Sequence, residues 1–322
     1  MKTKEELLRE VREDIKLDVP YVPGVIKKVD KCWHVSTDGA FADVLFEDRD
    51  DFVRAVNAIA KCYLVFGVLI FAFCLMDNHV HFVLYGEKAE VVAFIREFLR
   101  RVSHSISTRH GRRSVVASIP LSVEAITDEE YLKNAICYDI NNPPVGGVKC
   151  SYFDYPWSSG ALYFRNDSSW ASPAWFGDKL KTFKELPYAV TSVLDRSGKL
   201  IPRDWHMAGD MVFPGDFVCV KLVESLFRSH RAFCFLCGRR NEKEMEKNDS
   251  YSAMFMQDSE LRQLRNELLG EMFGCRRIHT LSIPERIRLA RRLRKKYACS
   301  LKQAARMVCL PHGTLEKALG IK

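Results

Sequence analysis

The sequence has no hydrophobic segment long enough to cross a membrane. Its longest apolar run, Tyr63 to Met76, has 14 residues and contains a glycine, whereas a membrane helix needs roughly 18 consecutive apolar residues. The first ten residues are largely charged, and no apolar signal core follows them. We therefore expect a cytoplasmic protein that makes no contact with a membrane.

Internal repeats and low-complexity tracts are also absent, which argues against a solenoid or a disordered chain. The 322 residues are 47% hydrophobic and 28% charged, enough to bury a sizeable core in two or three domains. The eleven cysteines are an odd number, and without a signal peptide they are interpreted as reduced thiols. One group of residues could form a zinc site, although its spacing fits no common zinc finger: His230, Cys234, Cys237, Cys275 and His279. Buried free thiols are the simpler interpretation.

Positive charge outside the C-terminal tail is balanced. The net charge is +8, and residues 280–322 alone carry eleven basic and two acidic side chains. A basic stripe on a small helical module is typical of nucleic-acid binding. The alternative is an ordinary solvated helix face.

Apolar spacing predicts an α+β protein in the first half of the chain, since runs of period two alternate with segments of helical period. Strand-like and helix-like segments follow one another, and the prolines after Asn142 should end the last helix. Thr127 and Glu130 have the spacing of a capping box before that helix. The expected strands or extended segments are residues 31–36, 41–46, 68–74 and 79–85, and the expected helices are 50–66, 89–109 and 128–140.

Three domains are expected. Residues 1–165 form the α+β domain, residues 166–274 an extension of uncertain structure with one helix from Ser259, and residues 275–322 an all-α module. In the module, helices over 283–297, 300–308 and 314–319 have the outline of a helix-turn-helix. Apolar and basic side chains separate onto opposite faces of the first of these helices, which favours DNA binding over a merely solvated face.

Two histidines on one strand are the strongest local signal of chemistry. His79 and His81 project to the same side of an extended segment, while Val80 and Phe82 project to the other. Two adjacent imidazoles suit a divalent metal. Paired core or surface histidines without a metal are at least as common.

The sequence around these histidines resembles the HUH motif of single-tyrosine transposases, most closely the REP-associated tyrosine transposases and their insertion-sequence relatives. The central segment reads C-L-M-D-N-H-V-H-F-V, from Cys74 to Val83. Further segments that resemble the family occur in the same order, namely W-H-V-S-T-D-G, F-E-D-R-D-D-F, T-R-H-G-R-R, I-T-D-E-E-Y-L, Y-D-I-N-N-P and D-Y-P-W-S-S. The resemblance covers about residues 25–165, and the tail resembles accessory DNA-binding helices of some relatives.

The resemblance implies a ferredoxin-like antiparallel sheet whose HUH strand holds Mg²⁺ or Mn²⁺. It also implies a helix-borne tyrosine that attacks single-stranded DNA, giving a 5′-phosphotyrosine and a free 3′-hydroxyl. The expected partners are single-stranded and hairpin DNA, with duplex DNA at the C-terminal module and a second copy of the chain in a homodimer.

The chain departs from the family at the nucleophile, because Leu121 and Ser122 stand where the tyrosine is expected. Tyr131 is the replacement predicted here. Tyr138 and Tyr155 are interpreted as packing residues. The third metal ligand is predicted to be Glu124, with Asp128 and Glu129 as alternatives, because Mg²⁺ prefers oxygen ligands.

DNA contacts are predicted in both the α+β domain and the tail. In the α+β domain they are phosphate contacts, from Arg96, Arg100, Arg101, Arg109, Arg112 and Arg113. In the tail they are the basic cluster of the first helix, Arg288, Arg291, Arg292 and Lys295. A reading helix and its neighbour are expected to meet duplex DNA at Lys302, Arg306, His312, Thr314 and Lys317.

Three hypotheses of function follow. The first is an active transposase that cleaves and rejoins single-stranded DNA, which the two histidines favour. The second is a catalytically inactive, domesticated transposase that binds hairpin or duplex DNA as a regulator, which Leu121 and Ser122 favour. The third, a metal-dependent hydrolase, is weaker because two histidines alone supply too few ligands.

Overall fold

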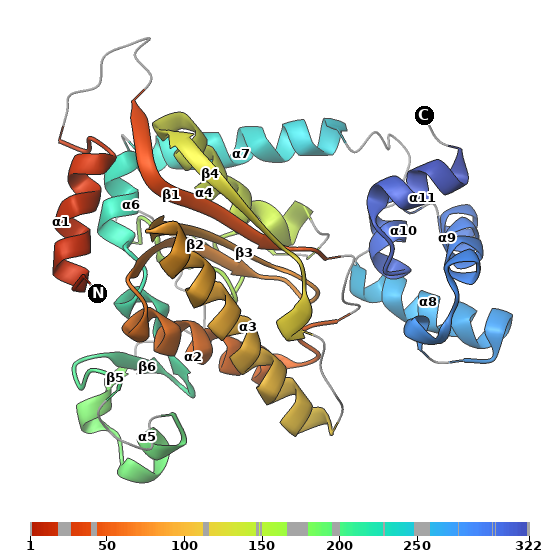
Figure 1. Ribbon diagram of the computed structural model, residues 1–322, viewed down its shortest axis with the longest axis horizontal. Helices are drawn as coiled ribbons and strands as arrows, with labels where there is room; N and C mark the ends of the chain where they lie inside the picture. Colours follow the sequence, from red (N-terminus) through yellow and green to blue (C-terminus); the bar gives the residue numbers. More distant parts are fainter. Residues whose placement is uncertain are drawn as a thin grey trace.

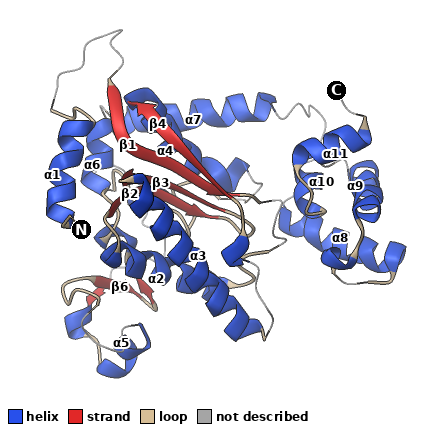
Figure 2. Ribbon diagram, viewed as in Figure 1, coloured by secondary structure: helices blue, strands red, loops and turns tan. Residues whose placement is uncertain are grey.

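The computed structural model describes most of the chain. The described residues are 2–18, 27–39, 44–111, 116–145, 148, 150–165, 180–194, 200–227, 229–247, 258–275, 277–297, 299 and 301–320. Figure 1 shows the course of the chain, and Figure 2 shows that its strands form two groups among many helices. The α+β class expected from the sequence is confirmed.

The helices and strands have these bounds. The strands are β1 Lys28–Thr37, β2 Val68–Leu75, β3 Val80–Gly86, β4 Leu121–Asp128, β5 Lys181–Thr182, β6 His206–Ala208 and β7 Met211–Val212. The helices are α1 Lys4–Asp14, α2 Arg49–Val65, α3 Lys88–His110, α4 Glu129–Val145, α5 Tyr188–Leu194, α6 Val220–Leu226, α7 His230–Lys247, α8 Asp258–Phe273, α9 Ile283–Tyr297, α10 Leu301–Met307 and α11 His312–Leu319.

The main sheet has the strand order β2-β3-β1-β4, and all of its neighbouring strands are antiparallel. Strands β2 and β3 are buried along their whole length, because helices cover both faces of the sheet. On one face the ring of Phe82 packs edge-on against Phe94 and Phe98 of α3. On the other face lies α4, whose Tyr138 contacts His81. Successive strand residues therefore face two different environments.

The extension folds onto this first layer rather than apart from it. Its small sheet has the order β5-β6-β7, and the amide of Asn57 on α2 donates to the carbonyl of Asp210. Phe217 and Phe233 belong to the same hydrophobic cluster as the main sheet. Helix α7 packs against α4, where the side chain of Asn141 donates to the Cys237 carbonyl over 2.8 Å.

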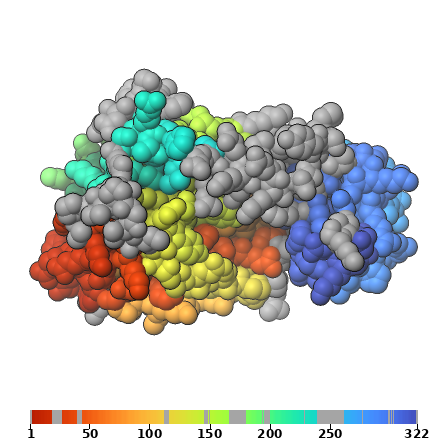
Figure 3. All heavy atoms as spheres, turned by 90° about the horizontal axis from the view of Figure 1, so that it is seen from above, coloured from red at the N-terminus to blue at the C-terminus, as the bar shows by residue number. Residues whose placement is uncertain are grey.

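Helices α8 to α11 form a second hydrophobic cluster. Leu261 and Leu268 of α8 are fully buried together with Leu289, Leu293 and Leu315. Helix α8, which lies in the expected extension, thus shares its core with the tail. The described residues of this unit gather at one end of the molecule in Figure 3. We call residues 258–320 the C-terminal module.

Two local predictions need correction. Helix α4 does not end at Asn142 but runs to Val145 through two prolines. Pro143 has no N–H to donate to the carbonyl of Asp139, four residues earlier. The side-chain amide of Asn142 donates to that carbonyl instead, and also to the carbonyl of Tyr138. At the start of α4, the carboxylate of Asp128 caps the helix by accepting from the Tyr131 amide, in place of the Thr127 box.

The extended segment expected at residues 41–46 was also not found where the structure can test it. Residues 41–43 lie outside the described residues, and 44–46 are not in a strand.

Lys4 gives the fold a testable dependence on pH. Its ammonium donates to the carbonyls of Phe66 and Val68 and lies 4.0 Å from the centre of the Tyr63 ring. Burial lowers the pKa of Lys4 to about 8. Between this value and the ordinary pKa of 10.5, the unfolded chain binds more protons than the folded one. The free energy of unfolding should therefore rise with pH over that interval, by at most about 3 kcal/mol.

Urea unfolding from pH 7 to 10.5 measures this effect, with Lys4→Met as the variant. The variant should lose the rise while the wild type keeps it. An unchanged rise in the variant would assign the titration to another group.

Candidate functional site

Three side chains from three different elements meet on the face of the main sheet that α4 covers. His34 lies on β1, His81 on β3 and Asp139 on α4. Ser36 pairs with His81 in the β1–β3 register, so His34 and His81 are diagonal neighbours on one face. Their rings are stacked, with centroids 5.8 Å apart and an interplanar angle of 17°.

The Asp139 carboxylate lies between the two imidazoles. Its Oδ1 is 2.8 Å from Nε2 of His34 and 3.8 Å from Nδ1 of His81. These three ligand atoms lie within 4.8 Å of one another, so that they could hold a metal ion. Asp139 is fully buried and His81 is 6% exposed, which places the group in a low-dielectric environment.

Burial and mutual charge set the protonation of this group. Burial disfavours the charged form of His34, but the charge and hydrogen bond of Asp139, with a contribution from Glu124, raise its pKa. Burial raises the pKa of Asp139, and His34 opposes this only in part. Burial, together with His79 and His34, lowers the pKa of His81 well below its usual value. His81 is therefore a neutral imidazole, the form that binds metals.

Two buried polar atoms of the group lack a hydrogen bond among the described residues. They are Nδ1 of His81 and Oδ2 of Asp139. A buried polar atom without a partner costs roughly 1 to 3 kcal/mol. Such a cost at two adjacent atoms is typical of a functional site rather than of a packing core.

His79 lies just before β3 and is half-buried. Its ring centroid is 4.9 Å from that of His81, so the two predicted histidines are neighbours. Its Nδ1 is 2.7 Å from Oδ1 of Asn78. Among the described residues, His79 does not belong to a group of three or more that could share an ion.

The predicted nucleophile and the predicted third ligand contact each other. The hydroxyl of Tyr131 donates to Oε2 of Glu124 over 3.2 Å. Glu124 is exposed on β4 and pairs with His34 across the strands, so it lies on the same face as the histidines. Burial and the charge and hydrogen bond of Glu124 raise the pKa of Tyr131.

Tyr138, interpreted from the sequence as a packing residue, lies nearer to the histidines. Its ring contacts those of His34 and His81 edge-on, with centroids 5.7 and 5.5 Å away. Ser122, at the expected tyrosine position, is on β4 and donates to Glu124. Sequence reasoning missed His34 and Asp139. A lone carboxylate inside the apolar run A-I-C-Y-D-I is the signal that could have identified Asp139.

The basic residues predicted on α3 have local partners. Arg100 and Arg101 form ion pairs with Glu97, and Arg96 donates to the carbonyl of Ile119. Helix α3 covers the sheet face opposite the histidines, so the structure does not bring these arginines to His81. Arg112 and Arg113 lie outside the described residues.

A second group of possible metal ligands consists of Asp48, Asp51 and His110. Arg109 already lies among them: its guanidinium forms a two-bond ion pair with Asp48 at 2.9 Å and also contacts Asp51. The group therefore has a cation of its own and fastens the end of α3 to the start of α2.

The structure does not assemble the predicted zinc ligands. Cys234 faces His230, with Sγ 3.2 Å from Nε2, and Cys237 faces Cys137 at 3.3 Å. Cys275 packs against the hydrophobic cluster of the C-terminal module instead. Among the described residues, no group of three possible ligands contains these cysteines.

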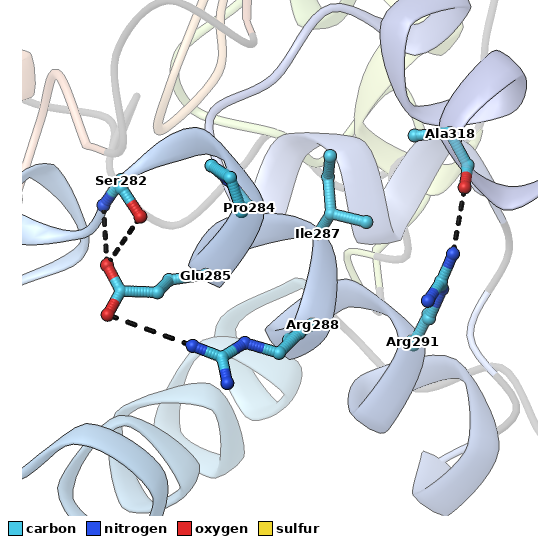
Figure 4. A pocket seen from close by; sticks show the side chains of 7 residues that line it. All are labelled: Ser282, Pro284, Glu285, Ile287, Arg288, Arg291 and Ala318. Carbon is cyan, nitrogen blue, oxygen red and sulfur yellow. Dashed lines mark hydrogen bonds and ion pairs between the residues drawn. The ribbon is translucent and has the colours of Figure 1, made fainter.

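The basic face of α9 is exposed. Arg288, Arg292 and Lys295 project into solvent, whereas Leu289 and Leu293 are buried. A hollow of about 490 Å³ lies beside this face. Figure 4 shows the residues that line it, which are Ser282, residues of α9, and Ala318.

Other predicted DNA contacts of the C-terminal module are placed as follows. Arg291 donates to the Ala318 carbonyl over 2.9 Å, which ties α9 to α11. Thr314 and Lys317 of α11 are exposed and Arg306 is half-buried. The side chain of Lys302 lies outside the described part of the chain.

Comparison with known proteins gives one structural similarity. No family model matches the sequence, and no curated protein matches it either. A solved structure of a REP-associated tyrosine transposase bound to a REP hairpin matches 48% of this chain and 92% of its own, with 17% sequence identity and a TM-score of 0.35. In the part of the chain that the structure describes, none of the helices combines the length and the hydropathy that a membrane crossing requires.

Proposed function

We propose that this chain is a DNA-binding protein of the transposase type that cleaves and rejoins single-stranded DNA through a phosphotyrosine. The observation that carries the proposal is the proximity of two tyrosines of α4 to a buried group of possible metal ligands on one sheet face. The order of the family-like motifs along the sequence supports the same function. The elements β1-α2-β2-β3-α3-β4, with the sheet order β2-β3-β1-β4, support a ferredoxin-like fold.

In this proposal, Tyr131 is the nucleophile and Glu124 is its base. The carboxylate lies 3.2 Å from the phenol oxygen, within the distance at which a base can accept the proton. The phenol oxygen forms a bond to phosphorus, the bond from phosphorus to the 3′ oxygen breaks, and that oxygen leaves with a proton. A 3′-hydroxyl that attacks the phosphotyrosine reverses these steps and rejoins the strand.

The donor set of His34, His81 and Asp139 fits a divalent ion, because the fully buried carboxylate and the neutral imidazole each leave an atom without a partner. Such an ion, when bound, supplies charge neutralisation to a phosphate. The basic face of α9 and the exposed end of α11 would hold duplex DNA as a helix-turn-helix.

A second candidate function is a regulator that binds DNA without cutting it. The raised pKa of Tyr131 favours it, since a phenol that resists deprotonation is a poor nucleophile. Leu121 and Ser122 at the expected tyrosine position favour it as well.

Intact-protein mass after incubation with single-stranded hairpin DNA and Mn²⁺ separates the two functions. We expect a covalent adduct that is absent in Tyr131→Phe and present in the control Tyr188→Phe, because Tyr188 is 71% exposed and far along the chain from the site. Loss in Tyr138→Phe instead would move the nucleophile to the tyrosine that contacts the histidines. An adduct that persists in both α4 variants would exclude these nucleophiles. Tight binding without any adduct would establish the regulator.

A further inference from the structure

We infer that His34, His81 and Asp139 form the metal centre of this protein without His79, and that this centre selects a transition-metal ion such as Mn²⁺ or Co²⁺ over Mg²⁺. The inference deepens the proposed function and rests on it only for what the ion would do. The ligand set itself follows from the three side chains and can be tested without DNA.

Two of the three distances between the ligand atoms are close to those around a coordinated ion, and the third is at most 4.8 Å. Ligand bonds of about 2.0 to 2.2 Å separate neighbouring ligands by roughly 3 to 3.5 Å. The two distances from Asp139 Oδ1 are 2.8 Å to His34 and 3.8 Å to His81. Side-chain rotations that bring the two imidazole nitrogens to this spacing would therefore let the three atoms share an ion.

Two buried atoms without hydrogen-bond partners indicate that a cation binds between His81 and Asp139. Nδ1 of His81 and Oδ2 of Asp139 are both buried and have no hydrogen bond among the described residues. Asp139 is 0% and His81 6% exposed, so bulk water does not compensate them. A hydrogen bond between His34 and Asp139 satisfies only part of the group. A cation would satisfy the imidazole and the carboxylate together.

The chemistry of the ligands determines the class of ion. Mg²⁺ takes oxygen ligands almost exclusively and keeps several waters. Two imidazoles with one carboxylate instead suit ions such as Mn²⁺, Fe²⁺, Co²⁺ or Zn²⁺. Three protein ligands also leave positions free for an oxygen of water or phosphate.

His79 differs from His81 in both contacts and burial. It is half-buried, and its Nδ1 faces the side chain of Asn78. The Cβ of a residue other than glycine at position 39 would come within 3.3 Å of that nitrogen, so the backbone holds the ring closely from the other side. The two histidines that the sequence pairs therefore differ in their surroundings, and among the described residues only His81 belongs to the group of possible ligands.

Metal titration of the purified full chain tests the inference. Mn²⁺ binding is measured by electron paramagnetic resonance, and Co²⁺ binding by its visible absorption, which also reveals thiolate ligands in this cysteine-rich chain. We expect one ion per chain, no thiolate band, and Mg²⁺ at least 100-fold weaker than Mn²⁺. Asp139→Asn and His34→Gln should each weaken binding by at least 30-fold, whereas the matched control His79→Gln should change it by less than 3-fold.

Each alternative outcome has a definite meaning. Equal losses in His79→Gln and His81→Gln, with Asp139→Asn unaffected, would overturn the inference in favour of the adjacent histidine pair. If the wild type binds neither ion, the inference is wrong, and His34 and Asp139 form a structural hydrogen bond. Circular dichroism of metal-free Asp139→Asn, an isosteric change, separates lost ligation from lost folding. DNA adduct formation by a wild type that binds no ion would leave the proposed function standing while this inference fails.

Discussion

Replacement of Arg288, Arg292 and Lys295 by glutamine is expected to weaken duplex DNA binding roughly 100-fold at physiological salt. The three side chains are exposed along α9, in the only part of the sequence with a large excess of positive charge. Each lost phosphate contact removes about 0.9 from the slope of log affinity against log salt. The slope should therefore fall by roughly 2 to 3.

Fluorescence anisotropy over a salt series measures both quantities. The matched control is Arg100→Gln with Arg101→Gln, which removes two basic side chains from α3, where both are ion-paired with Glu97. The control should change affinity by less than about 3-fold, because Arg100 and Arg101 lie on α3, outside the segment that carries the excess of positive charge. If the control variant weakens binding as much as the α9 variant does, the α+β domain also contacts phosphate, as the sequence predicts.

The histidine group and the basic face lie on different hydrophobic clusters of the chain. The main sheet carries the histidine group under α4, and the C-terminal module carries the basic face. A partly buried ion pair connects them, since Arg262 of α8 lies 2.8 Å from Asp77 in the turn before β3. This ion pair links the turn that precedes the histidines to the first helix of the module.

Elements with strong local periodicity could be predicted from the sequence. Helices α2 and α3 and strands β2 and β3 begin and end within a residue or two of their expected positions. In the tail, α9 was predicted to its last residue, Tyr297. Glu285 also accepts from the amide and hydroxyl of Ser282, three residues before it, which is the spacing of a capping box. Local side-chain patterns are enough for such elements, because their cause lies within one or two turns.

Strand β4 was not predicted from the sequence. Its residues are half exposed at an edge of the sheet, and L-S-V-E-A, from Leu121 to Ala125, alternates apolar and polar side chains, which is the local signal of a strand that was missed. It becomes a strand by pairing with β1, which lies about ninety residues earlier in the chain. The same pairing places Glu124 opposite His34, a relation that no spacing in the sequence reveals.

The candidate site shows the same limit. His81 was predicted as a ligand because the two histidines alternate on one strand. Asp139 joins it only through the packing of α4 across the sheet, over more than fifty residues of chain. A pattern within one strand therefore pairs His81 with His79, whereas tertiary packing brings His81 together with His34 and Asp139. Which grouping binds an ion is the question that the His79→Gln control answers.

Leu268→Ala is expected to destabilise the C-terminal module strongly and to leave the stability of the main sheet unchanged. Leu268 is fully buried in the cluster formed by α8 to α11, and its truncation should cost about 3 kcal/mol. A module of this size has a free energy of unfolding of only roughly 3 to 9 kcal/mol. Duplex binding should fall sharply, because the basic face of α9 depends on this core for its shape.

Hydrogen exchange measured by mass spectrometry locates the effect. Amides of α8 to α11 should lose protection in Leu268→Ala, while those of β2 and β3 keep theirs. The control on the same helix is Met272→Ala, since Met272 is 38% exposed and its truncation leaves no buried cavity. If β2 and β3 lose protection together with the module, the Arg262–Asp77 connection joins the two clusters into one cooperative unit. If protection in α9 to α11 survives, α8 belongs to the extension, and the module begins near residue 275 as the sequence predicted.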